Sequence, residues 1–183
     1  MINSNHIKTL GLRYLFPAVL LLASSASINA QRTDQNANLK AVFIYNFTMY
    51  FDWNAASTDA DFIIGVIGSS PVKPALLMVA ATKDVRGRKI VIKSFRNSAD
   101  ITACDMLFIP GDCKIPLSMI LERVPEGTLT VSEKPGYAMA GACLNFLLVN
   151  NRLKFEANLD ALSKARLKAS SQLLKLAIIV NKQ

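Results

Sequence analysis

The stretch Leu39–Trp53, LKAVFIYNFTMYFDW, carries six aromatic rings in fifteen residues. Its large side chains fall on two adjoining stripes of a helix, which are Phe43, Phe47, Tyr50 and Phe51, and Val42, Asn46, Met49 and Trp53. A helix this apolar is either sandwiched in a core or presents part of its surface to a partner. We therefore predict a buried helix here. We also keep a second hypothesis, in which its outer edge around Tyr50 and Trp53 forms a contact patch.

The segment before this helix has the layout of a secretory signal peptide. Lys8 and Arg13 form a short basic start, Leu15–Ala23 is apolar, and small residues follow as far as Ala30. The apolar run is too short to span a bilayer comfortably. We predict that residues 1–30 are a signal removed on export, with cleavage after Ala30 or after Ala26. Residues 31–183 would then be the exported domain.

The exported part has the size of one domain with its own core. No low-complexity tract, repeat or linker rich in proline, glycine and serine divides it. Loss of Lys8 and Arg13 would lower the formal net charge from +8 to +6. Such an excess is compatible with an anionic membrane surface or an acidic partner. We predict no nucleic-acid binding, because no basic run is interleaved with exposed aromatic residues.

Histidine is absent from the exported part, because His6 would leave with the signal. Its absence removes catalysis by Ser-His-Asp or Cys-His groups and most zinc sites. Three cysteines do not complete a Cys₄ metal site, and no motif places two carboxylates on one cleft. We therefore predict a protein that is not an enzyme and has no metal and no cofactor. A histidine-free enzyme remains the remote alternative.

The odd cysteine count limits an exported chain to one intrachain disulfide. Cys104 and Cys113 flank a predicted short strand and its Pro110-Gly111 turn, so these two could meet and leave Cys143 reduced. In the other interpretation all three cysteines are small apolar side chains. The spacing does not decide between the two.

The rest of the chain alternates between strands and helices. Buried strands are predicted at Phe62–Ile67 and Met106–Ile109, further strands at Arg88–Phe95 and Leu129–Val131, and helices at Val72–Ala81 and Ile115–Arg123. Gly68–Ser70 reads as a plain turn from strand to helix, with Ser70 as the N-cap. The expected fold is α/β, a single domain with a mixed central sheet flanked by helices, a C-terminal β-hairpin and a terminal helix. That last helix carries a stripe of Leu173, Leu176, Ala177 and Val180.

Asn150-Asn151 joins two predicted strands, Ala142–Val149 and Arg152–Asn158, in a two-residue turn. Such a turn fixes the register and places Phe146 opposite Phe155 on an apolar face. The opposite face carries the polar residues Asn145, Arg152, Lys154, Glu156 and Asn158. These side chains are either simply solvated or part of a binding surface.

Taken together, the blocks KAVFIYNFTMYFDW, FIIGVIGSSPV, VRGRKIVIKSF and ACDMLFI, and the segment from LTVSEKPGYAMAG to the final helix, resemble the YfiR/HmsC-like periplasmic proteins. The aromatic helix and the F-E-x-N-L-D segment around Glu156 carry most of the likeness. Family members use disulfides for redox sensing. This chain keeps a cysteine at Cys104 but lacks the family's cysteines near Tyr137 and near Asn145–Phe146.

The resemblance implies a periplasmic regulator without catalysis of its own. It would bind the periplasmic sensor domain of an inner-membrane diguanylate cyclase, repress cyclic di-GMP synthesis and biofilm formation, and form a homodimer. The residues expected to bind the partner are Tyr50, Trp53, Asn145, Glu156 and Asn158. The rival hypothesis is a periplasmic small-ligand module that feeds a membrane sensor kinase and uses the strand ends near Gly68–Ser70 as its cleft.

Overall fold

The computed structural model describes residues 36–53 and 60–180. The chain divides into two compact units, residues 1–37 and 38–183, and every described strand belongs to the second. The predicted signal at 1–30, its cleavage site and the domain boundary after it lie outside the described residues. Within the described ranges, no helix is both long enough and apolar enough to cross a membrane.

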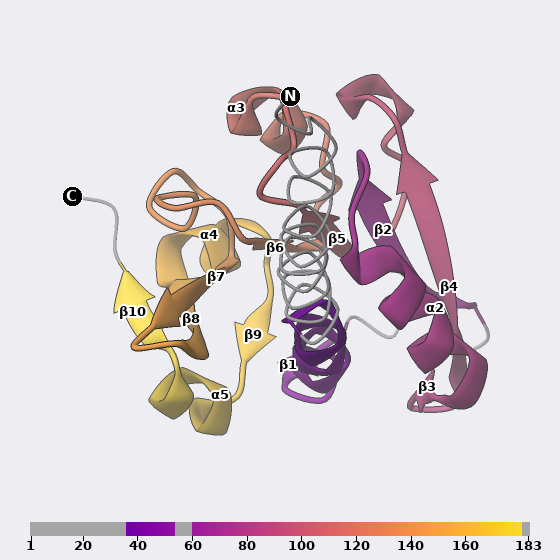
Figure 1. The fold of residues 1–183 in the computed structure, drawn as a ribbon, viewed down its shortest axis with the longest axis horizontal. Helices are drawn as coiled ribbons and strands as arrows, with labels where there is room; N and C mark the ends of the chain where they lie inside the picture. Colours follow the sequence, from indigo (N-terminus) through magenta and orange to yellow (C-terminus); the bar gives the residue numbers. More distant parts are fainter. Residues whose placement is uncertain (1–35, 54–59, 181–183) are drawn as a thin grey trace, which may run out of the picture. The chain divides into compact units, whose positions relative to one another are not determined.

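An eight-stranded mixed sheet organises this unit, in the order β10-β8-β7-β6-β5-β2-β4-β3 (Figure 1). The strands are β2 Phe62–Ile67, β3 Asp84–Val85, β4 Arg88–Phe95, β5 Met106–Ile109, β6 Leu129–Ser132, β7 Leu144–Val149, β8 Arg152–Asn158 and β10 Ile178–Val180. The neighbours from β4 through β7 pair in parallel, whereas β8 runs antiparallel to β7. β5 and β6 are buried along their whole length. The predicted fold class is confirmed.

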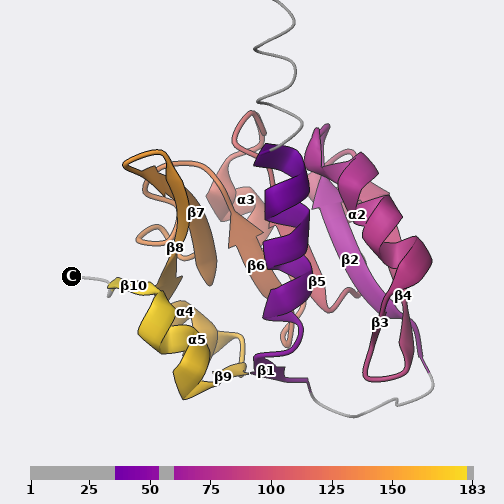
Figure 2. The ribbon, with the colours of Figure 1, turned by 60° about the horizontal axis from the view of Figure 1, so that its bottom comes forward.

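Helices cover both faces of the sheet. They are a first helix whose described part covers 36–47, here called the aromatic helix, then α2 Val72–Thr82, the 3₁₀ turn η1 Ser98–Asp100, α3 Leu117–Leu121, α4 Leu159–Lys164 and α5 Ser171–Leu176. Phe47 of the aromatic helix packs on Phe146 and Phe155, with ring centroids 5.7 and 5.0 Å apart. α3 packs with Leu107 and Ile109, which the strand register places on the opposite face. Figure 2 shows the two helices on different sides of β5 and β6.

The close packing of α3 against the sheet depends on Gly65. A Cβ atom at this position would lie 2.5 Å from the Phe95 ring and 3.1 Å from Leu107. Both of these side chains belong to the apolar cluster under α3. Glycine is therefore required for β4 and β5 to bring their side chains together over β2.

The aromatic helix ends earlier than the predicted Trp53. Its last turn tightens through hydrogen bonds such as Tyr50 N to Phe47 O, at 3.0 Å. The chain then forms β1, Phe51–Asp52, which pairs antiparallel with β9, Lys168–Ala169. The helix prediction was wrong for Phe51 and Asp52, because they pair with a strand that lies more than a hundred residues further along the chain.

The C-terminal segment also differs from the prediction in part. α5 ends at Leu176, and the predicted stripe does not continue to Val180. Ile178–Val180 instead form β10, which pairs in parallel with β8. Three consecutive β-branched residues favour a strand wherever a free edge is within reach.

The predicted hairpin register is confirmed at every pair from Val149–Arg152 to Leu144–Ala157. Asn150 and Asn151 both adopt positive φ, 49° and 59°, as a tight two-residue turn demands. Phe146 and Phe155 lie under the aromatic helix, so the apolar face is buried as expected.

Candidate partner-binding site

The polar face of the hairpin is more buried than the sequence predicted. Asn145 and Asn158 are only 1% and 2% exposed. Asn158 donates from Nδ2 to the Ala138 carbonyl at 2.7 Å, and its Oδ1 accepts from Ala161 N at 2.8 Å to cap α4. The prediction that these two amides are exposed for a partner was therefore wrong. Asn158 holds a loop and a helix in place.

Asn145 links three strands through its side chain. Its Oδ1 accepts a hydrogen bond from Ser132 Oγ of β6 at 2.7 Å, and its Nδ2 donates to Glu156 Oε2 of β8 at 2.9 Å. Glu156 is half-buried. The Asn145 amide thus fixes Oε2 of the Glu156 carboxylate, whereas Oε1 accepts no hydrogen bond from the described residues. The buried amide orients a carboxylate that solvent can still reach.

Glu156 lines a cleft of about 370 Å³ beside the end of β6. The cleft is bounded by Lys40, Glu133, Pro135, Gly136, Asn145, Phe146, Leu147, Leu148, Leu153 and Glu156. We call this set the hairpin cleft. Its walls are mostly apolar, and Leu148 on the rim is 61% exposed. Apolar walls around a few fixed charges are typical of recognition sites.

The second carboxylate of the hairpin cleft is already engaged. Glu133 forms an ion pair with Lys40 of the aromatic helix, and its Oε1 accepts from Gly111 N at 2.9 Å. This arrangement ties the carboxyl ends of β5 and β6 to the aromatic helix. Sequence reasoning missed both residues. The available signal was that Lys40 is a basic residue inside an apolar helix and that Glu133 directly follows a buried strand.

Trp53 lies at the other end of the aromatic helix and is half-buried. Its indole Nε1 donates to the Thr48 carbonyl at 2.7 Å, and its ring meets Phe62 edge-on with centroids 4.9 Å apart. Next to it, Arg88 pairs with Asp105 at 2.9 Å and stacks over the Phe62 ring at 5.0 Å. These contacts assign Trp53 a role in holding β1, β2 and the helix end together.

Tyr50 is also half-buried, and its carbonyl accepts from Ser170 N at 2.8 Å. It lines a cavity with Arg86 and Lys168, whereas Trp53 lines another with Arg88 and Asp105. Neither cavity includes Glu156. The structure therefore brings Asn145 and Glu156 together but does not join them to Tyr50 and Trp53.

The three cysteines are free thiols in the structure, so the disulfide considered for Cys104 and Cys113 is not formed there. Both pack in the apolar cluster under α3. Cys143 is also buried, although it lies on the same face of the hairpin as Asn145. Burial raises the pKa of Cys104 to about 11, and burial also raises the pKa of Cys143. The two thiols are thus protonated at neutral pH.

The Gly68–Ser70 turn is built as a helix start. Val72 N donates to Ser70 Oγ at 3.1 Å, and Gly68 N donates to the Phe95 carbonyl at 2.8 Å. Neither the hairpin cleft nor the cavities lined by Tyr50 and by Trp53 include this turn. Among the described residues, no group of three or more histidine, cysteine or acidic side chains is placed to hold a metal ion.

Comparison with known protein families gives one match that covers most of the chain. The family model described as YfiR/HmsC-like matches residues 37–178. The matched range runs from the aromatic helix to the first residue of β10, so it includes every residue of the hairpin cleft.

Proposed function

We propose, because the chain belongs to the YfiR/HmsC-like family, that it represses an inner-membrane diguanylate cyclase by binding the cyclase's periplasmic sensor domain. The family is known for regulating diguanylate cyclases from the periplasm and not for catalysis. The predicted signal at 1–30 would deliver the chain to this compartment. Repression would lower cyclic di-GMP and biofilm formation.

The observation that supports this proposal best is the state of Glu156. Its Oε2 is held by Asn145 at 2.9 Å, and its other oxygen receives no hydrogen bond from the described part of the chain. A carboxylate that is oriented in advance loses little side-chain entropy when a partner binds. The apolar walls of the hairpin cleft suit the aliphatic stem of an arginine or lysine. We therefore expect a basic partner side chain to contact Glu156.

Repression would work by mass action. If the protein binds only the inactive arrangement of the sensor domain, the cyclase population shifts toward that arrangement. The shift cannot exceed the difference in binding free energy between the two arrangements. We expect a homodimer to be the binding form, and light scattering of the purified protein measures this directly.

The test is a pull-down from solubilised membranes with tagged wild type, Glu156→Lys and Glu122→Lys. Both variants change the net charge by the same amount, but Glu122 is an exposed residue that follows α3 and lies outside the hairpin cleft. Wild type and Glu122→Lys should retain the cyclase, and Glu156→Lys should lose it. Equal retention by all three would contradict the proposed role of Glu156. Failure of the wild type to retain any cyclase would contradict the function itself.

A further inference from the structure

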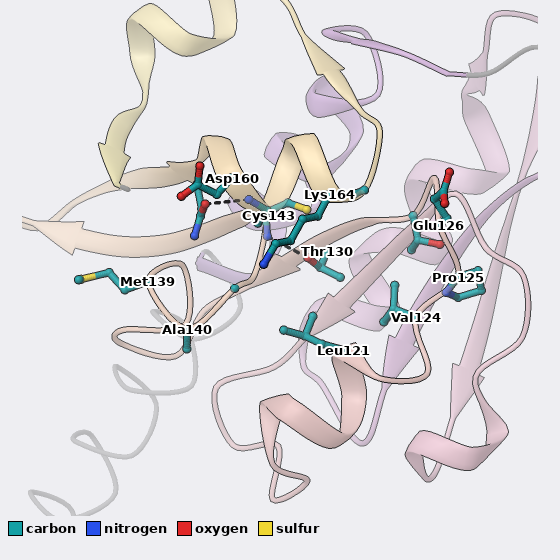
Figure 3. Close-up of a pocket in the computed structure, with 15 residues that line it drawn as sticks. Leu121, Val124, Pro125, Glu126, Thr130, Met139, Ala140, Cys143, Asp160 and Lys164 are labelled. Atoms are coloured by element: carbon teal, nitrogen blue, oxygen red, sulfur yellow. Dashed lines mark hydrogen bonds between the residues drawn. The ribbon is translucent and has the colours of Figure 1, made fainter. Parts of the chain in front are cut away.

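A second cavity, of about 400 Å³, lies on the sheet face opposite the aromatic helix. This volume falls within the range of small-molecule sites. Its apolar walls come from the end of α3 and from the loop after β6, at Leu121, Val124, Pro125, Met139 and Ala140. Figure 3 shows Leu121 and Val124 on the side of this space that faces Lys164, with Ala140 at its edge and the Met139 side chain turned outward. We call this space the α4 cavity, because α4 covers it. None of its lining residues belongs to the hairpin cleft.

The floor of the α4 cavity carries polar groups that already form hydrogen bonds within the protein. Thr130 Oγ1 accepts from Cys143 N at 2.9 Å, and Thr128 Oγ1 donates to the Cys104 carbonyl at 2.8 Å. Asn158 uses both ends of its amide, as described above. The floor therefore offers few unused hydrogen-bonding groups. The part of a ligand that contacts the floor can therefore be apolar, because it leaves no hydrogen-bonding group of the protein without a partner.

The charge that faces the α4 cavity is positive. Figure 3 shows the Lys164 ammonium directed into the space above Cys143, while the Asp160 carboxylate points away from it. Glu126 on the rim is paired with Arg166 at 2.8 Å. Lys164 forms no ion pair with the residues that the structure describes. One accessible cation above apolar walls favours a ligand with an anionic head and an apolar body.

We propose that the α4 cavity binds a small organic anion, with its head at Lys164 and its apolar body between Leu121, Val124 and Ala140. This inference does not depend on the identity of any protein partner. It also differs from the cleft expected at Gly68–Ser70, because it lies beside α4 and not at the start of α2.

The test is calorimetric titration with 4-phenylbutyrate and with its neutral match, 4-phenylbutyramide. The two probes share an apolar body and differ only in the charge of the head group. Wild type should bind the carboxylate about tenfold more tightly than the amide, as expected for one charge-assisted hydrogen bond. Lys164→Met should abolish that difference. Lys168→Met, which alters an exposed lysine outside the cavity, should keep it.

Two further measurements do not depend on removing the charge. Ala140→Trp should weaken the binding of both probes by filling the cavity. The melting temperature of the wild type should rise with the concentration of 4-phenylbutyrate, whereas that of Ala140→Trp should not. The proposal is overturned if the carboxylate shows no saturable binding, if both probes bind equally, or if Lys164→Met binds as the wild type does.

Discussion

The two ends of the aromatic helix are built for different tasks. At its start, which we call the open end, Lys40 joins a cleft in which Glu156 keeps one carboxylate oxygen free of hydrogen bonds from the described residues. Just past its other end, which we call the closed end, the single polar atom of the Trp53 side chain donates to the Thr48 carbonyl, and the Trp53 ring packs against Phe62. An aromatic residue near a surface is therefore not a recognition residue when its contacts are already complete. Four predictions test this difference.

The largest effect is expected for Trp53→Ala. The substitution removes a hydrogen bond and two aromatic contacts at the closed end, and we expect the free energy of unfolding to fall by about 3–4 kcal/mol. Urea denaturation followed by circular dichroism measures this. The fraction that remains folded should bind the partner normally. Unchanged stability with lost binding would show instead that Trp53 is a partner contact.

The next effect is expected for Asp105→Ala at the same end. This carboxylate pairs with Arg88 and accepts from Ile63 N at 2.7 Å. Its loss leaves the Ile63 amide unmatched and removes the charge partner of Arg88, whose part-buried guanidinium keeps only its bonds to the carbonyls of Ala60 and Asp61. We expect a cost of about 2–3 kcal/mol in unfolding free energy. A double-mutant cycle with Arg88→Met isolates the coupling. A coupling energy near zero would show that the ion pair between Asp105 and Arg88 does not stabilise the closed end.

A smaller effect on stability is expected for Asn145→Ala at the open end. The substitution removes the hydrogen bonds to Ser132 and Glu156, and we expect a loss of about 1–2 kcal/mol. Partner affinity should also fall, because Glu156 is no longer held in place. Ser132→Ala loses the first bond and the longer contact of Ser132 Oγ with the Leu144 carbonyl, at 3.3 Å, but keeps the bond from Asn145 to Glu156, so the comparison isolates the effect of that bond on affinity. If both variants bind the partner with equal affinity, Asn145 does not orient the Glu156 carboxylate.

The smallest effect is a pH dependence from Cys104. Burial raises the pKa of this thiol from 9.0 to about 11, so the folded state keeps its proton where the unfolded state loses it. The contribution to stability is complete below pH 9 and declines as the pH rises from 9 toward 11, by about 1 kcal/mol at pH 10. Cys104→Ala should flatten this part of the stability curve. An unchanged slope would contradict the assignment.

The sequence predicted most of the sheet because its strands are continuous apolar runs. The hairpin register followed from Asn150-Asn151, since a two-residue turn leaves one pairing that buries Phe146 and Phe155. The burial of Asn145 and Asn158 could not be predicted in this way. It depends on a loop that contacts Asn158 from twenty residues away. A pattern of alternating residues shows which face is polar but not what covers that face.

The candidate site was predicted only in part for the same reason. Glu156 was found from the register and from the resemblance. Lys40 and Glu133 were missed because their ion pair joins residues 93 positions apart. The end of the aromatic helix was missed because β9, far along the chain, pairs with Phe51 and Asp52. Local periodicity carries no information on such pairings.

The central claim is that Glu156 in the hairpin cleft carries repression while the closed end carries stability. The most direct measurement is cyclic di-GMP in cells that express the cyclase together with wild type, Glu156→Lys or Glu122→Lys, at matched protein levels. We expect low cyclic di-GMP with wild type and Glu122→Lys. We expect raised cyclic di-GMP with Glu156→Lys, although this variant should melt near the wild-type temperature. Full repression by a normally expressed Glu156→Lys would show that Glu156 does not carry repression.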